Sequence, residues 1–463
     1  MTGKIAAVNG PVVDVEFSGA EALPGMYEIL EALDRFGRQV TLEVMEHLSQ
    51  TRVRCISLAT SINVVRGSEV RSTGKVIEVP VGEKVLSRVL NVLGQPIDGL
   101  GPIEAEKMKP IRRRDKKFLL NPEMRERQKF EILETGIKMV DLLFPLIKGS
   151  KNGILGGAAL GKSLLTLEVI HNVVHKHHGA CVFTGVGERI REGHELYHEL
   201  KRTGILDRVA LVYGQMDEPP GARFEAILTG ITLAEHLREK NQDVLFFVDS
   251  VYRFAQAGME VSTLMGHIPS ETGYQPTLSS EMSEFHERIQ TEAAGSITAV
   301  ESVYVPADDL TDPAVVTIFS YLDSIVVLSR ARVQKGLYPA IDPLLSSTVN
   351  LDPDIVGKRH FDIAQETLRI LRRLEELNHI VSVIGIEELS KSDRLLYERG
   401  LRLQNFLTQP FFTAELHTGR PGAYVPVGQT LNGCRMILDG RFDQVPEDKL
   451  YLIGELQERR REG

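Results

Sequence analysis

A glycine-rich segment about a third of the way along the chain constrains the fold most strongly. It matches the phosphate-binding loop pattern G-x-x-x-x-G-K-[ST] and consists of Gly156, Gly157, Ala158, Ala159, Leu160, Gly161, Lys162 and Ser163. The backbone N–H groups of such a loop point at a polyphosphate, the Lys162 ammonium reaches the β- and γ-phosphate oxygens, and the Ser163 hydroxyl can ligate Mg²⁺. We therefore expect these eight residues to bind a nucleoside triphosphate together with Mg²⁺.

The residues on either side of the loop support this interpretation. Residues 153–155 read as the apolar end of a strand, and apolar residues recur at helical spacing after the loop until Gly179. These residues are Leu164, Leu167, Val169, Ile170, Val173 and Val174. A strand, a glycine loop and a helix in this order direct the N-terminus of the helix at an anion.

An acidic residue follows a second run that is typical of a buried strand. Residues 243–248 are mostly apolar and lead directly to Asp249. A carboxylate at a strand end can hold Mg²⁺ through water, and we expect Asp249 to fill this role. Arg253 lies one helical turn further on, where its guanidinium can reach the same phosphate.

Glu188 and Arg189 follow another apolar run, residues 180–183. Buried strands that alternate with helices predict a parallel sheet, and such sheets bind ligands at the carboxyl ends of their strands. A carboxylate there can orient the water that attacks a γ-phosphate, and an arginine can stabilise the charge on that phosphate. A surface ion pair is the alternative for these two residues. The candidate catalytic residues are thus Lys162, Glu188, Arg189, Asp249 and Arg253.

The chain divides into three parts by its pattern of apolar residues. Residues 1–75 contain short β-branched runs separated by glycine and proline, which predict a small β-barrel. Residues 76–345 alternate short apolar runs with long helical stretches, which predicts an α/β core around the phosphate loop. Residues 346–463 predict a helical bundle. The expected fold is therefore α/β at the centre, with a barrel before it and helices after it.

Composition excludes several classes of function. The net charge of −9 argues against a nucleic-acid partner, because phosphate backbones are bound by basic surfaces. No run approaches the roughly 18 apolar residues that a membrane span needs, so the chain would work at a membrane only through partners. The basic residues 112–117 are expected to form a solvated loop.

Several segments extend these motifs into a resemblance over essentially the whole chain. In order, they are residues 187–189, 211–216, 218–223, 273–278, 305–314 and 338–340. They resemble the catalytic beta subunit of the F-type rotary ATP synthases. Residues 8–15 and 91–98 resemble the same family.

This resemblance implies an assembly and a location. Members of the family carry a P-loop domain of the RecA-like type, and three beta chains alternate with three alpha chains around a central rotating stalk. ATP is made or hydrolysed as ions flow through a membrane sector, so the chain is expected at the cytoplasmic face of a bacterial or archaeal membrane, held there by the complex. Residues that match a loop touching the rotor are Asp309, Thr311 and Asp312.

The resemblance also adds residues to the site. Glu192 is expected to contact Mg²⁺ through water, which makes Ser163, Glu192 and Asp249 the expected metal ligands. Tyr338 and Phe411 match aromatic positions that sandwich adenine in the family. The family's transition-state arginine comes from the neighbouring alpha chain, so an isolated chain is expected to bind nucleotide but to turn it over poorly.

Four positions and one segment depart from the family pattern. Ala159 replaces a usual glycine; if the backbone there has φ > 0, alanine costs about 1 kcal/mol. Ser163 stands where threonine is usual, which the general loop pattern accepts. Ser250 replaces an asparagine, His417 replaces a second adenine-contacting phenylalanine, and the acidic lever at residues 387–393 contains a lysine. These changes indicate a divergent branch, such as the product of a second synthase operon.

Two other functions remain open. A non-catalytic or regulatory nucleotide-binding ring subunit, like the alpha chain, has the same loop, but the alpha chain has glutamine where Glu188 stands. A protein-export ATPase shares the core, whereas the rotor-loop match and the Leu389-Ser390 centre of the lever favour the synthase.

Overall fold

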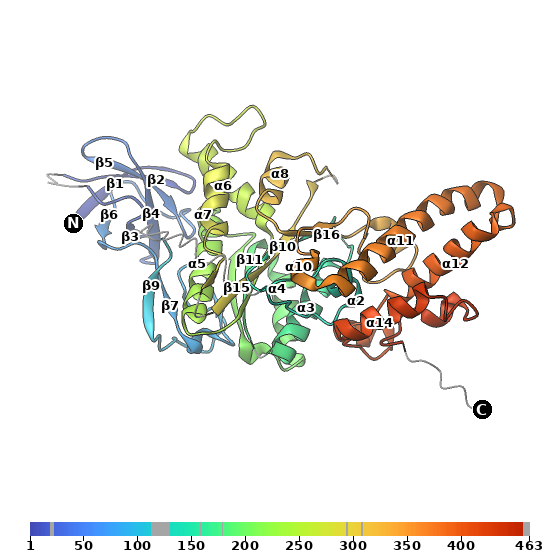
Figure 1. Ribbon diagram of the computed structural model, residues 1–463. Coiled ribbons are helices and arrows are strands. Elements are labelled where there is room, and N and C mark those ends of the chain that lie inside the picture. Colours follow the sequence, from blue (N-terminus) through green and yellow to red (C-terminus); the bar gives the residue numbers. More distant parts are fainter. Residues whose placement is uncertain are drawn as a thin grey trace. The chain divides into compact units, whose positions relative to one another are not determined.

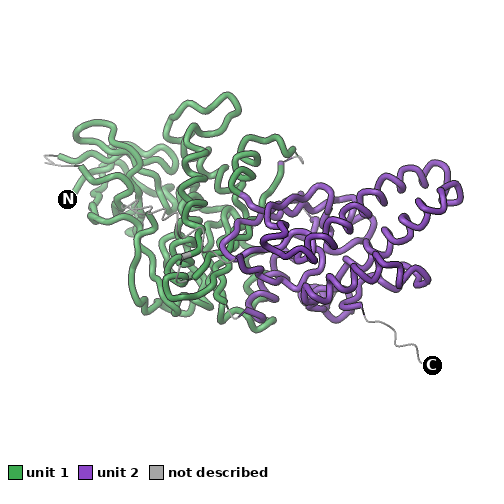
Figure 2. Tube along the Cα trace, in the orientation of Figure 1, with its two compact units in different colours: residues 1–127, 179–305, 309–321 green, residues 128–178, 306–308, 322–463 purple. Residues whose placement is uncertain are grey.

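A computed structural model describes residues 1–18, 23–112, 130–157, 159–177, 179–292, 295–306 and 309–456. The chain forms two compact units (Figures 1 and 2). Unit 1 comprises residues 1–127, 179–305 and 309–321, and unit 2 comprises residues 128–178, 306–308 and 322–463. The division into three domains at residues 75 and 345 stays a prediction.

A closed barrel of six strands opens unit 1 and confirms the predicted barrel. Its strands are β1 (Thr2–Asn9), β2 (Val12–Glu16), β3 (Ile29–Leu33), β4 (Gln39–His47), β5 (Arg52–Ser57) and β6 (Glu69–Ser72). The barrel closes because β6 pairs with both β1 and β3 in the order β1-β2-β5-β4-β3-β6. Val13 and Val15 alternate with polar neighbours and fill its interior, as the period of two in a strand requires.

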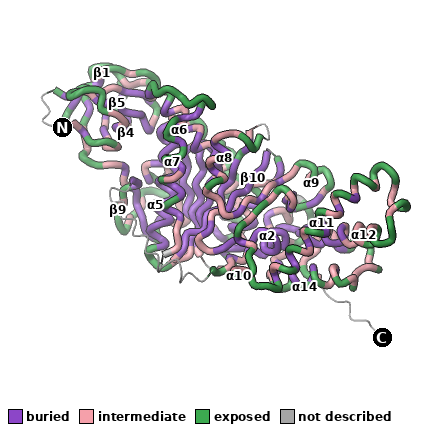
Figure 3. The backbone as a smooth tube through the Cα atoms, turned by 45° about the horizontal axis from the view of Figure 1, so that its top comes forward, coloured by how far each residue is buried: buried purple, intermediate pink, exposed green. Residues whose placement is uncertain are grey.

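The rest of unit 1 is built on parallel strands in the order β15-β13-β11-β12-β8. They are β8 (Val89–Leu90), β11 (Ala180–Glu188), β12 (Val209–Gln215), β13 (Val244–Asp249) and β15 (Gly295–Val303). The longer strands are buried along most of their length (Figure 3), because helices cover them, as is usual for a parallel sheet. A short β14 (Thr291–Glu292) pairs antiparallel with β15, and β7 (Glu78–Val81) pairs with β9 (Lys107–Pro110).

The helices of unit 1 follow the strands in the alternation that the sequence predicts. They are α4 (Ile190–Arg202), α5 (Pro220–Glu239), α6 (Val251–Met265), α7 (Leu278–His286) and α8 (Pro313–Phe319), with 3₁₀ turns η1 (Glu83–Val85) and η2 (Leu206–Arg208). Helix α5 packs on β11, β12 and β13 and is buried on nearly every side. It therefore belongs to the core of the unit.

Unit 2 begins with α2 (Lys138–Leu143), β10 (Lys151–Leu155) and α3 (Lys162–His177). β10 pairs in parallel with β16 (Ser324–Val327), and β17 (Ser347–Thr348) pairs antiparallel with β16. The remaining elements are α9 (Arg330–Gln334), α10 (Pro353–Val356), α11 (Lys358–Ile384), η4 (Ile386–Glu388), α12 (Lys391–Phe406), η5 (Phe412–Ala414), α13 (Glu415–Thr418), α14 (Val427–Leu438) and η6 (Glu447–Leu450).

Helices α11, α12 and α14 pack against one another and confirm the predicted helical C-terminal part. The face of α11 that meets its neighbours carries Ile370, Leu371, Leu374 and Leu377, which recur at helical spacing. Over the described stretches of the chain, no helix combines the length and apolar character needed to cross a bilayer.

Candidate functional site

The phosphate loop lies in unit 2 between β10 and α3, as predicted. β10 ends at Leu155, and α3 begins at Lys162, so the loop glycines occupy the turn from strand to helix. Gly161 has a φ of +88°, and among the described residues no atom beyond the adjoining backbone lies within 4 Å of the position that a Cβ would take there. The open space beside this turn is what a backbone cradle for an anion requires. Ala158 lies outside the described residues.

The backbone at Ala159 has the positive φ at which alanine is less favourable than glycine. Its φ is +63°, in the left-handed region. An alanine there costs about 1 kcal/mol relative to glycine, because its Cβ crowds the following carbonyl. The strain is therefore located in the loop itself.

The remaining loop residues differ in how far they are buried. Gly156, Gly157 and Leu160 are buried, whereas Ser163 is exposed and Lys162 half-buried at the first turn of α3. A Cβ on Gly156 would lie 3.0 Å from Cβ of Leu328 and 3.3 Å from Leu160, so the surrounding side chains leave no space for a larger residue at position 156. The groups that can contact a phosphate or Mg²⁺ are those left accessible at the helix N-terminus.

The two aromatic residues predicted to flank a base also lie in unit 2. Tyr338 is 45% exposed, whereas Phe411 is 8% exposed and precedes η5. Their segments meet where the backbone N–H of Gln409 donates to the carbonyl of Tyr338 at 2.9 Å. The side chain of His417 lies outside the described parts of the chain.

Glu168 contacts the segment after Phe411 in unit 2, and the sequence interpretation missed it. It lies on α3 and is fully buried. Its carboxylate accepts hydrogen bonds from the backbone N–H groups of Phe412 and Thr413 at 3.2 and 3.1 Å. A charged residue inside the apolar stripe of a predicted helix was the available signal, because buried carboxylates are rarely left without specific partners.

The candidate carboxylates gather in unit 1, at the carboxyl ends of two neighbouring parallel strands. β11 ends at Glu188 and β13 ends at Asp249, and the register pairs Asp249 with Gly185. Glu188 is only 9% exposed. Burial raises the pKa of Glu188, and a hydrogen bond with Glu192 and the negative charge of Asp249 add to the rise. Glu188 and Asp249 therefore lie at the same edge of the sheet, within unit 1.

The two arginines belong to different segments near the end of β11, since Arg189 directly follows the strand and Arg253 lies in the first turn of α6. Gly187 has a φ of +62°, and a Cβ there would lie 3.0 Å from Cδ of Arg253, so glycine allows the arginine to lie against the strand. Arg189, 65% exposed in its side chain, pairs with Glu192 at 3.4 Å. The hydrogen bond with Glu188, followed by the charges of nearby arginines including Arg189 and Arg253, lowers the pKa of Glu192.

The donor groups fit Mg²⁺ that is bound mainly through phosphate. Within the part of the chain that the structure describes, no group of three or more His, Cys, Asp or Glu side chains is arranged to hold a metal by itself. Mg²⁺ usually takes one or two carboxylates, several waters and phosphate oxygens, and unit 1 offers two carboxylates of this kind, Glu192 and Asp249. The Ser163 hydroxyl, the third predicted ligand, belongs to unit 2. Burial is the main cause of the raised pKa of Glu188, and the smaller contribution from the negative charges of Asp249 and Glu192 would be offset by a nearby cation.

The predicted residues thus form two groups, each within one unit. Unit 2 holds the phosphate loop with Tyr338 and Phe411, and unit 1 holds the cluster of carboxylates and arginines, whose members are Glu188, Arg189, Glu192, Asp249 and Arg253. The metal ligands are divided in the same way. That the two groups serve one nucleotide is a prediction.

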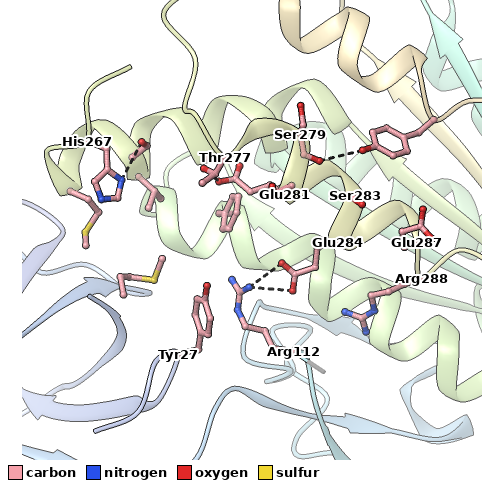
Figure 4. A pocket seen from close by; sticks show the side chains of 18 residues that line it. Tyr27, Arg112, His267, Thr277, Ser279, Glu281, Ser283, Glu284, Glu287 and Arg288 are labelled. Carbon is pink, nitrogen blue, oxygen red and sulfur yellow. Dashed lines mark hydrogen bonds and ion pairs between the residues drawn. The ribbon is translucent and has the colours of Figure 1, made fainter. Parts of the chain in front are cut away.

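A pocket of about 780 Å³ lies elsewhere in unit 1 and contains none of the described candidate residues (Figure 4). Tyr27 of the barrel lines one side, and residues of α6 and α7 line the other. Arg112 lies over the Tyr27 ring at 3.9 Å, ion-paired with Glu225 and, at 3.4 Å, with Glu284. The expectation that Arg112 belongs to a solvated loop is wrong, because these partners bury its guanidinium. Residues 113–117 lie outside the described residues.

Comparison with protein families defines the class to which this fold and these motifs belong. Residues 136–348 match the nucleotide-binding domain of the ATP synthase alpha/beta family, and residues 5–74 match the beta-barrel domain of the same family. Together these matches cover more than half of the chain. The chain therefore belongs to the ATP synthase alpha/beta family, and its predicted resemblance to a beta-like subunit of the rotary ATP synthases is confirmed.

The C-terminal part narrows the description further. Residues 350–431 match the C-terminal domain of V and A type ATP synthase. The sequence motifs resemble the F-type synthases, whereas this C-terminal domain matches the V and A type. Subunits of the alpha/beta family form hexameric rings around a central stalk, which makes the chain a ring subunit that binds nucleotide.

Proposed function

We propose that the chain is the catalytic ring subunit of a rotary ATP synthase, which makes ATP from ADP and phosphate or hydrolyses it. The carrying observation is Glu188, a buried carboxylate at the carboxyl end of a parallel strand. Asp249 ends the neighbouring strand, and Arg253 lies against Gly187. A non-catalytic subunit has no need of a carboxylate at this point.

In the proposed reaction the two half-sites serve one Mg·ATP. The loop residues and Lys162 bind the phosphates, and Tyr338 and Phe411 flank the base. Glu188 orients the attacking water and accepts its proton, while Arg189 and Arg253 stabilise the charge on the transferred phosphoryl group. Asp249, Glu192 and Ser163 would hold Mg²⁺, which neutralises charge on the phosphates when bound.

The proposal includes the setting that the resemblance implies. Alternating alpha chains complete the ring, a central stalk turns within it, and a membrane sector passes the coupling ion. The chain is then a peripheral component at the cytoplasmic face of the membrane. It has three domains, at residues 1–75, 76–345 and 346–463. An arginine supplied by a neighbouring chain is worth roughly 10³ to 10⁵ in rate, so the isolated chain should hydrolyse ATP far more slowly than the ring.

Glu188→Gln in the reconstituted ring tests the catalytic assignment. The amide keeps the shape of the side chain but cannot accept a proton from water. Mg·ATP binding should persist, and hydrolysis should fall by roughly 10² to 10⁴. Glu199→Gln is the control, because it removes a carboxylate from the far end of α4, where Glu199 pairs only with Arg202 among the ion pairs seen.

A second candidate is a nucleotide-binding ring subunit without catalysis, since the family that matches includes both alpha and beta chains. In that case the wild-type ring would bind Mg·ATP at this subunit, and Glu188→Gln would leave its hydrolysis unchanged. Persistent hydrolysis in the variant would thus reject the assigned role of Glu188.

A further inference from the structure

Glu168 connects the helix of the phosphate loop to the segment that follows Phe411. Its carboxylate accepts four hydrogen bonds, all within unit 2. Three come from η5: the backbone N–H of Phe412 at 3.2 Å, and the backbone N–H and hydroxyl of Thr413, both at 3.1 Å. The fourth comes from the Asn172 amide at 3.4 Å. A second contact joins the same elements, since the His171 ring lies 5.0 Å from that of Phe412.

The environment of Glu168 explains why these bonds fix the segment. The side chain is fully buried, and a buried carboxylate without hydrogen bonds would be very costly. The two backbone N–H groups at the start of a 3₁₀ turn likewise have no partner within that turn. Each side therefore satisfies the other, and η5 has one favoured position on α3.

The position of Glu168 along α3 matters for a nucleotide. It lies six residues after Lys162, which corresponds to about 9 Å along a helix axis at 1.5 Å per residue. A rigid helix thus separates the group that contacts phosphate from the group that holds the Phe411 segment. The same segment reaches Tyr338 through the hydrogen bond of Gln409 at 2.9 Å.

We propose that Glu168 is a positioning residue for the base of the bound nucleotide. It sets the distance between the phosphate loop and the aromatic residues by fastening the Phe411 segment to the loop's own helix. This inference rests on the proposed function in one respect, namely that Phe411 and Tyr338 flank the base. It adds a residue that touches neither phosphate nor base and yet determines how well both are bound together.

Glu168→Gln in the full-length chain tests this role with two probes. The amide nitrogen would face the N–H donors of η5, so at least one hydrogen bond is lost and the segment is released. Equilibrium binding of Mg·ATP should weaken about tenfold, as expected for a hydrogen bond to a charged group. Binding of Mg·tripolyphosphate, which has no base, should change by less than about twofold because the phosphate loop is intact.

Two more variants keep the test decisive if Glu168→Gln folds poorly. Thr413→Val removes only one donor and should weaken Mg·ATP about threefold with tripolyphosphate unaffected. Asp323→Asn is the matched control: Asp323 also accepts a backbone N–H in unit 2, from Lys151 at 2.8 Å, and should leave the ratio of the two affinities unchanged.

The outcomes separate the two proposals. Equal weakening of Mg·ATP and Mg·tripolyphosphate in the Glu168 and Thr413 variants, or no change in either, would overturn the positioning role. A wild-type chain that binds tripolyphosphate and ATP equally well would also overturn it, because no base site would then exist to position. A wild-type chain that binds neither ligand would instead refute the proposed function.

Discussion

Replacing Ala159 by glycine should stabilise the protein. Ala159 has a φ of +63°, a left-handed conformation that costs an L-residue roughly 1–2 kcal/mol. Glycine adopts this conformation without that cost, but it also gains about 0.4–1 kcal/mol of conformational freedom in the unfolded chain. The difference leaves a net stabilisation of about 0.5–1 kcal/mol for Ala159→Gly.

Ala331 provides the matched control for this change. It is exposed and lies in the short helix α9 of the same unit, so Ala331→Gly removes the same methyl group from a right-handed position. Glycine there should destabilise the protein by about 0.5–1 kcal/mol. Thermal melts of the full-length chain without nucleotide should therefore shift in opposite directions, by about 2–4 °C per kcal/mol for a unit of this size.

A fall in melting temperature for Ala159→Gly that equals the fall for Ala331→Gly would refute the reasoning. It would mean that the backbone at residue 159 is not strained by its Cβ. Mg·tripolyphosphate affinity gives a second measurement on the same protein. Because the generic loop pattern leaves this position free, the affinity of Ala159→Gly should stay within about threefold of wild type.

Two further predictions concern groups outside the phosphate loop. Burial raises the pKa of Asp141 from 3.8 to about 7, so the folded protein keeps a proton that the unfolded chain has lost. The resulting stabilisation is complete below the unfolded pKa and is lost as the pH rises toward 7. Over this interval the free energy of unfolding of the wild type should fall, relative to that of Asp141→Asn, by up to about 1.4 kcal/mol per pH unit. Parallel plots of the free energy of unfolding against pH for the two proteins would contradict this prediction. Tyr274→Phe removes a hydroxyl that donates to Asp312 at 2.8 Å and should cost about 1–2 kcal/mol. Tyr321 is the control, because its hydroxyl makes only an exposed hydrogen bond of 3.3 Å. Tyr321→Phe should lower the free energy of unfolding by less than half as much as Tyr274→Phe, and equal losses would count against the Tyr274 contact.

Local patterns in the sequence were sufficient for the elements and for the loop. The alternating residues of the barrel, the strand before Gly156 and the helix after Lys162 are each determined within about 20 residues. The positions of Glu188 and Asp249 at strand ends are local in the same sense, because Asp249 directly follows the apolar run 243–248 and Glu188 lies five residues after the apolar run 180–183, at the end of β11. What these predictions needed was the position of a residue at a strand end, and topology then placed neighbouring strand ends together.

Contacts between distant segments could not be found in this way. Glu168 meets Phe412 and Thr413 across 244 and 245 residues, and nothing near it in sequence identifies those partners. Arg112 was assigned to a solvated loop because its neighbours are basic, yet Glu225, 113 residues away, buries it. Glu168 and Arg112 are buried with these partners because an unpaired buried charge would destabilise the fold. Which partners are close enough to pair depends on the folded structure and not on the local sequence.

The roles proposed for the candidate residues place nucleotide binding chiefly in unit 2 and chemistry chiefly in unit 1. Phosphate and base contacts are assigned to unit 2, so affinity for Mg·ATP should depend chiefly on groups such as Lys162 and Phe411. The groups that orient water and stabilise developing charge are assigned to unit 1, where Glu188 and Arg253 lie. A change confined to the second group lowers the rate without removing the contacts that bind the nucleotide, since an interaction made only in the transition state contributes to turnover and not to ground-state affinity.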